Sequence, residues 1–217
     1  MKVVEYIEFG ILYATVVLFI ARYKQLDQPF KRLIFYLLNL ALGNTLAFYL
    51  FACLHKENLW LFHFLTPMEY TALCIVFHGS LSNPLLRKAI LLSLPCFITL
   101  CILLTRYVNK MDENDAVARI AEALLVTTWI LFYFRELSTT EKILDIQRDP
   151  LFWVYTGLMI YFWGTLFLQG LLNYLNRLDR ILANRLYTWQ YVFEYTSLLT
   201  INMGLFCDRI FRRRVAG

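Results

Sequence analysis

The sequence predicts an all-α integral membrane protein in which seven helices cross the bilayer. Of its 217 residues, 59% are hydrophobic and only 17% are charged, whereas soluble domains typically contain about 45–50% apolar and about 25% charged residues. The charged residues cluster between long apolar runs. A spanning helix needs about 20 mostly apolar residues, so seven of them with short loops use nearly the whole chain. We therefore expect residues 1–217 to form a single transmembrane domain.

Seven apolar stretches mark the expected spans, and turn-forming residues separate them. Asn83-Pro84 breaks the chain after the third stretch. Asp149-Pro150 opens the sixth stretch, with proline near a helix start, where it is favoured. The spans are expected at residues 3–21, 33–53, 59–78, 89–105, 116–134, 151–173 and 186–207.

Lys and Arg are unevenly divided between the two ends of these spans. With Arg119 left out because it lies inside a span, thirteen fall on the side that includes the C-terminus and seven on the other side. Cytoplasmic loops carry the excess of basic residues, so we expect an outside N-terminus and a cytoplasmic C-terminus. The net charge of +5 reflects these loops and does not indicate nucleic-acid binding.

The last span continues into a basic segment that contains Arg209, Arg212, Arg213 and Arg214. Anionic lipid headgroups attract clusters of this kind. We therefore expect these arginines to contact the cytoplasmic membrane surface or a cytoplasmic partner protein.

Ionisable groups within the spans are the candidate functional residues, because such groups are costly in a bilayer and by default mark a site. Four carboxylates lie within or at the edge of spans, namely Glu8, Glu69, Glu122 and Glu194. In the expected topology Glu69 lies near mid-membrane and the other three lie nearer the outside. His63 also falls in the outer half, so an acidic cavity open to the outside is one prediction.

The seventh span carries a polar stripe in which Tyr187, Gln190, Glu194 and Ser197 recur at spacings of three and four. Residues with this spacing share one helix face, and a carboxylate there must face protein or water. The stripe predicts either the lining of a ligand site or a hydrogen-bonded seam between helices.

Two of these four carboxylates, Glu69 and Glu122, also have a purely structural interpretation. Glu69 follows Pro67, which removes a backbone hydrogen bond and favours a local kink, so Glu69 is either a binding or proton-relay residue or a neutral acid bonded to a neighbouring helix. Arg119 and Glu122 are three residues apart on one helix face and are expected to pair with each other.

Two glycines of the sixth span, Gly157 and Gly164, are seven residues apart on one helix face. They are expected to permit close helix packing.

Motifs for catalysis or metal binding are missing from the sequence. There is no GxSxG, no HExxH and no phosphate-binding glycine loop, and the five cysteines show no CxxC spacing. The sequence therefore predicts no cofactor and no metal site, and it disfavours an enzyme.

Two stretches carry a resemblance to a known class: Pro67-Met68-Glu69-Tyr70, and Asp149-Pro150-Leu151-Phe152-Trp153 leading to Ile160-Tyr161-Phe162-Trp163-Gly164. They resemble the seven-helix modules at the N-terminus of some bacterial sensor histidine kinases and their stand-alone relatives in Bacteroidota. The resemblance implies a location in the bacterial inner membrane, ligand sensing from outside and signal transfer through the last helix. The chain contains no kinase domain, so the signal would pass to a separate protein.

The leading prediction is thus a non-enzymatic sensing module that contacts the lipid bilayer and a cytoplasmic signalling or effector protein. The first alternative is a transporter or a homo-oligomeric pore that uses Glu69, Glu122 and Glu194 as cation or proton sites. The second is a lipid-modifying membrane enzyme with Glu69 and His63 as acid–base groups.

Overall fold

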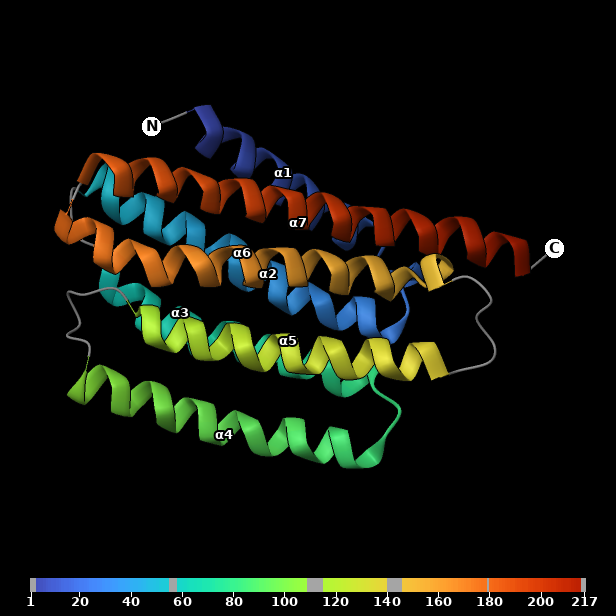
Figure 1. Ribbon diagram of the computed structural model, residues 1–217. Helices are drawn as coiled ribbons and strands as arrows, with labels where there is room; N and C mark the ends of the chain where they lie inside the picture. The colour runs from blue at the N-terminus through green and yellow to red at the C-terminus, as the bar shows by residue number, and fades with distance from the viewer. Residues whose placement is uncertain (1–2, 55–57, 109–114, 140–145, 179, 216–217) are drawn as a thin grey trace. The chain divides into compact units, whose positions relative to one another are not determined.

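The computed structural model describes residues 3–54, 58–108, 115–139, 146–178 and 180–215, with side chains described outside 3–5, 51, 171–187 and 208–215. All regular structure within this part is helical (Figure 1). Short 3-10 turns lie at Tyr23–Gln25 and Ile146–Arg148, and a π-helical turn at Tyr49–Cys53. The α-helices are α1 (Val3–Ala21), α2 (Gln28–Phe48), α3 (Leu59–Ser80), α4 (Pro84–Tyr107), α5 (Ala116–Thr139), α6 (Pro150–Leu178) and α7 (Arg180–Val215).

Four stretches of helix are long and apolar enough, by length and composition, to cross a membrane. They are α3, α4, α5 and the Pro150–Gly170 part of α6. In α4 only 17% of the most apolar window is buried within the protein, and large apolar side chains such as Leu92 and Ile102 are exposed there. An apolar exposed surface of this kind is what a bilayer-embedded helix presents to lipid. The helices therefore fit a membrane protein.

The predicted turn residues start two of the helices. The Leu85 amide donates to the Asn83 side chain at 2.9 Å, directly before α4. The Leu151 amide donates to Asp149 Oδ1 at 2.7 Å, directly before α6. In both cases proline is the first helical residue, where its missing N–H leaves no partner unsatisfied. The Asp-Pro prediction of a helix start is confirmed. The fourth span was expected to begin at residue 89, but α4 begins at Pro84.

Several helices extend beyond the apolar stretches that predicted them. The second stretch was expected to begin at residue 33, but α2 begins at Gln28 and includes Lys31 and Arg32. The seventh was expected at 186–207, whereas α7 runs from Arg180 to Val215. Charged long side chains lower hydropathy without lowering helix propensity, so hydropathy marks the apolar part of a helix and not its ends.

The chain divides into two compact units. Unit 1 comprises Met1–Thr15 and Val126–Gly217, which include α6, α7 and parts of α1 and α5. Here α6 and α7 run side by side in opposite directions (Figure 1). A Cβ atom added to Gly157 would lie 2.8 Å from the Ser197 carbonyl oxygen, and one added to Gly164 would lie 2.3 Å from the Phe193 ring. The predicted close-packing role of both glycines is confirmed.

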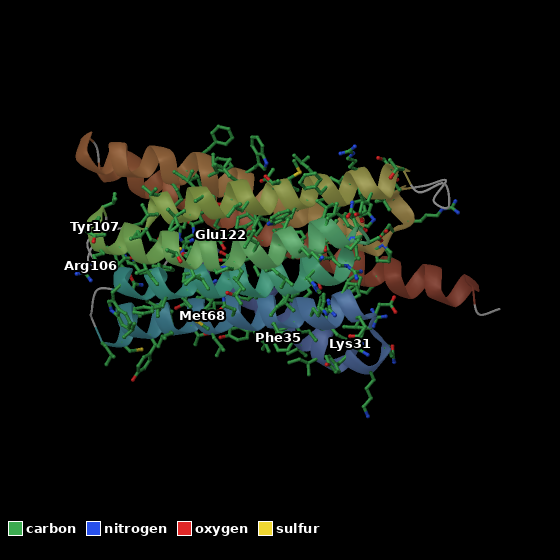
Figure 2. The ribbon with its side chains drawn as sticks, turned by 90° about the horizontal axis from the view of Figure 1, so that it is seen from below. Lys31, Phe35, Met68, Arg106, Tyr107 and Glu122 are labelled. Carbon is green, nitrogen blue, oxygen red and sulfur yellow. The ribbon has the colours of Figure 1, made fainter. Side chains whose placement is uncertain are left out.

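Unit 2 comprises Val16–Leu125 and contains α2, α3, α4 and the first part of α5. One face of α3 packs on α4: the Tyr70 hydroxyl lies 2.7 Å from Ser93 Oγ, and the Tyr70 and Phe97 ring centroids are 4.4 Å apart. At Gly43 of α2 an added Cβ would lie 2.9 Å from the Leu65 Cδ1 methyl of α3. In Figure 2, Lys31 and Arg106 lie at opposite ends of this unit and Glu122 lies between them.

Candidate functional site

Unit 2 contains a buried group of charged residues, here called the acidic cluster and defined as Glu69, Asp115, Arg119 and Glu122. Glu69 lies half-way along α3, and the other three lie immediately before or within the first two turns of α5. Asp115, Arg119 and Glu122 are spaced by four and three residues, which places them on one side of α5. Side chains of Glu69, Asp115 and Glu122 are all buried.

Asp115 of the acidic cluster accepts hydrogen bonds through both carboxylate oxygens. It is 1% exposed, and its Oδ1 lies 3.0 Å from Arg119 Nε in an ion pair. Its Oδ2 accepts a hydrogen bond from the Thr66 hydroxyl of α3. Arg119 also covers the Phe62 ring of α3, with 4.9 Å from its guanidinium carbon to the ring centroid. These contacts fix α5 against the Phe62–Thr66 turn of α3.

The ion pair differs from the one expected. We predicted that Arg119 would pair with Glu122, but the ion pair is formed with Asp115, one turn earlier. Helix side chains tilt toward the N-terminus, so a long Arg side chain reaches back along α5 toward residue i−4. Asp115 was not among the predicted site residues because it lies one residue before the expected fifth span. The sequence does contain a pattern that predicts this ion pair. Asp115 stands directly before a helix and four residues before Arg119, and residues with this spacing can pair.

Glu122 is 2% exposed, and its Oε1 has no hydrogen-bond partner among the residues that the structure describes. Of the charged groups around it, Glu69 has the strongest electrostatic interaction with the Glu122 carboxyl, followed by Arg119 and Asp115. Two of the predicted site acids, Glu69 and Glu122, therefore interact electrostatically. A buried oxygen without a donor is costly and marks a position that a proton or cation would stabilise.

His63 lies on the α4 side of α3. Its Nδ1 is 3.0 Å from the hydroxyl oxygen of Thr105. Tyr70, seven residues later, bonds with Ser93 on the same side. One face of α3 therefore contacts α4, while Phe62, Thr66 and Glu69 lie on the face toward α5.

The polar stripe of α7 belongs to unit 1. Glu194 and Ser197 are buried there, and Gln190 is half-buried with an Oε1 that has no hydrogen-bond partner in the described part of the chain. Tyr187, the fourth residue of the stripe, lies outside the described side chains. Unit 1 also buries Glu8 and Gln169. The stripe thus faces the protein interior, as a stripe with a carboxylate was expected to do.

The basic segment after the last apolar stretch is helical in its backbone. It forms the C-terminal end of α7, which ends at Val215. The side chains of Arg209, Arg212, Arg213 and Arg214 lie outside those described, so their predicted contacts with lipid or a partner stay predictions.

The helical fold and the buried carboxyl groups together indicate which class of protein this is. It is a helical bundle with helices suited to cross a membrane, and several of its helices bury a carboxyl group, among them those of Glu8, Glu69, Glu122 and Glu194. Across the described residues, no group of three or more His, Cys, Asp or Glu is arranged to bind a metal ion. Comparisons of the chain with protein-family models, curated proteins and solved structures find no match. The resemblance to sensor-kinase modules therefore stays a prediction.

Proposed function

We propose that the protein is a seven-helix module of the bacterial inner membrane that senses an external ligand and signals through a separate cytoplasmic partner. The observation that carries this proposal is the length of α7, one continuous helix of 36 residues. At about 1.5 Å per residue it is about 54 Å long, well beyond the roughly 30 Å of a hydrocarbon core. A helix of this length connects an intramembrane site with the aqueous phase.

The polar and basic parts of α7 lie at positions suited to that role. Glu194 lies in the first half of α7 among buried groups of unit 1, and Arg212 follows eighteen residues later. This separation is about 27 Å along the helix. Because a helix is stiff, a shift or rotation at Glu194 would reach the basic end, and helix shifts of this kind are an established form of switching. The excess of basic residues supports a cytoplasmic location for that end.

The signalling proposal is tested with Cys207 as an internal reporter on α7. In a variant that lacks the other four cysteines, the rate at which a membrane-impermeant thiol reagent modifies Cys207 would be measured in lipid nanodiscs. We expect Glu194→Gln to change this rate several-fold. The matched control is Met203→Leu, which alters an exposed side chain of the same helix and should leave the rate unchanged. Equal rates in wild type and Glu194→Gln would exclude coupling along α7.

Transport is the second candidate, and the buried Glu122 oxygen of unit 2 favours it, because transporters use intramembrane carboxylates as ion or proton relays. Purified protein in liposomes would be assayed for proton, Na⁺ and K⁺ flux. Flux that is abolished by Glu122→Gln would establish transport and replace the signalling proposal. Absence of flux for all three ions would remove the transport candidate.

A further inference from the structure

One end of unit 2 has a large excess of positive charge. It lies where α2 begins, α3 ends and α4 begins, and these segments are adjacent because Arg32 Nη1 of α2 lies 3.5 Å from the Ile75 carbonyl oxygen of α3. Asp27 is the one acidic residue that the sequence places in unit 2 at this end, and His78 in the last turn of α3 can add a further positive charge. The cations there, here called the basic end, are Arg22, Lys24, Lys31, Arg32, Arg87 and Lys88.

Two arginines of the basic end are held against the end of α3. The Arg32 side chain passes over the backbone of Gly79, where an added Cβ would collide with its guanidinium group. Arg87 Nε donates to the carbonyl oxygen of Leu81 at 2.6 Å, two residues after Gly79. Both guanidinium groups therefore lie at the same helix end, where they interact favourably with carbonyl groups and with the helix dipole.

These contacts use only a small part of the hydrogen-bonding capacity of the two arginines. An arginine side chain has five N–H donors in a planar fork. Arg87 donates through Nε, and the contact between Arg32 and Ile75 is long at 3.5 Å. Among the described residues, neither arginine forms an ion pair with a carboxylate. Both side chains are half-buried, so an anion at this position would meet partly desolvated, charged donors, which form strong hydrogen bonds.

Exposed apolar side chains lie one helical turn from the cations, toward the middle of unit 2. Phe35 follows Lys31 on α2 and is 59% exposed, and Leu92 follows Lys88 on α4 and is 68% exposed. Residues four apart share a helix face, so each cation stands at the end of an apolar strip. Figure 2 shows Lys31, Phe35 and Met68 along one side of unit 2. A cation followed by exposed apolar surface matches a phospholipid, which has a phosphate at the bilayer surface and acyl chains below it.

We propose that the basic end of unit 2 binds the headgroups of anionic phospholipids, with Arg32 and Arg87 as phosphate-binding residues and with Phe35 and Leu92 in contact with acyl chains. Guanidinium groups suit phosphate because two N–H donors can pair with two of its oxygens. The apolar strips favour a lipid over free phosphate, which cannot contact them. A zwitterionic headgroup carries its own cation, which a basic surface repels, so anionic lipids are preferred. This site lies within unit 2 and does not depend on a signalling role of α7.

The test is native mass spectrometry of the full-length protein in detergent micelles, titrated with phosphatidylglycerol or with phosphatidylcholine of identical acyl chains. We expect the wild type to bind phosphatidylglycerol several-fold more tightly. Arg32→Gln/Arg87→Gln should weaken this binding about fivefold for each cation removed, so that the preference over phosphatidylcholine is lost. Equal affinity of the wild type for both lipids, or unchanged affinity of the double variant for phosphatidylglycerol, would overturn the proposal.

The matched control is Arg106→Gln, which removes an exposed cation near the other end of α4. In Figure 2, Arg106 lies at the opposite end of unit 2 from Lys31. The control should leave the affinity for phosphatidylglycerol unchanged. A loss equal to that of the double variant would show that net charge alone attracts the lipid, and would also overturn the proposal.

Two further measurements complete the test. Lys88→Gln applies if the double variant fails to fold, because Lys88 is exposed and forms no hydrogen bond or ion pair with the described residues. It should weaken binding of phosphatidylglycerol about fivefold, and an unchanged affinity would contradict the proposal. Excess inorganic phosphate should not displace the bound lipid. Displacement would assign the basic end to a free anion instead of a lipid.

Discussion

The close contact between α6 and α7 of unit 1 leads to a quantitative prediction for Gly204→Ala. A Cβ atom at Gly204 would lie 2.6 Å from the Pro150 carbonyl oxygen, about 0.8 Å closer than the 3.4 Å at which ordinary van der Waals contact begins. The obstacle is backbone and cannot rotate away, so the two helices must separate. Overpacking of this kind costs about 1–3 kcal/mol.

Replacement of glycine by alanine also raises the intrinsic helix propensity, and the variant Gly170→Ala measures this effect by itself. Ala is up to about 1 kcal/mol more favourable than Gly within a helix. Gly170 of α6 is exposed, and among the described residues no atom lies within 4 Å of an added Cβ, so Gly170→Ala should be neutral or stabilising. Gly204→Ala should therefore be less stable than Gly170→Ala by about 1–3 kcal/mol.

The assay is SDS-driven unfolding of each purified variant in bicelles, followed by tryptophan fluorescence and repeated from the unfolded side to establish reversibility. Trp153 reports on this contact, because its Cβ lies 3.4 Å from the added Cβ position. Gly157→Ala, where the obstacle is the Ser197 carbonyl oxygen at 2.8 Å, should behave like Gly204→Ala. If Gly204→Ala proves as stable as Gly170→Ala, the inference that glycine sets the distance between α6 and α7 is refuted.

Three other substitutions test individual contacts by the same unfolding assay. Arg119→Met should destabilise the protein by about 3–5 kcal/mol because it leaves the buried carboxylate of Asp115 without its ion-pair partner. The double variant Arg119→Met/Asp115→Asn should recover much of this loss. If it recovers none, loss of the ion pair is not the cause of the destabilisation. Asp149→Ala removes the side chain that accepts the first amide of α6 and should cost about 0.5–2 kcal/mol, with Asp149→Asn as the control that keeps an acceptor. Asn202→Leu removes the 2.7 Å hydrogen bond from α7 to Thr15 of α1 and should cost about 0.6–2 kcal/mol; an equal cost in a Thr15→Val background would show that this bond is not responsible.

Hydropathy and turn chemistry predicted the parts of this protein that depend on short stretches of chain. The helical regions follow from apolar runs, and the start of α6 follows from Asp149-Pro150. The close approach at Gly157 was also predictable, since a small residue on an apolar helix has few other uses. Each of these properties is decided by a residue and its neighbours within a few turns.

Tertiary structure alone decided how the ionisable groups are paired. The sequence identified Glu69, Glu122 and Arg119 as candidates, but it could not show that Glu69 of α3 and Glu122 of α5 interact electrostatically or that Asp115 is the ion-pair partner of Arg119. Helical periodicity fixes which side of its own helix a residue occupies. Which other helix covers that side depends on packing between segments far apart in the chain, and this leaves no local pattern in the sequence.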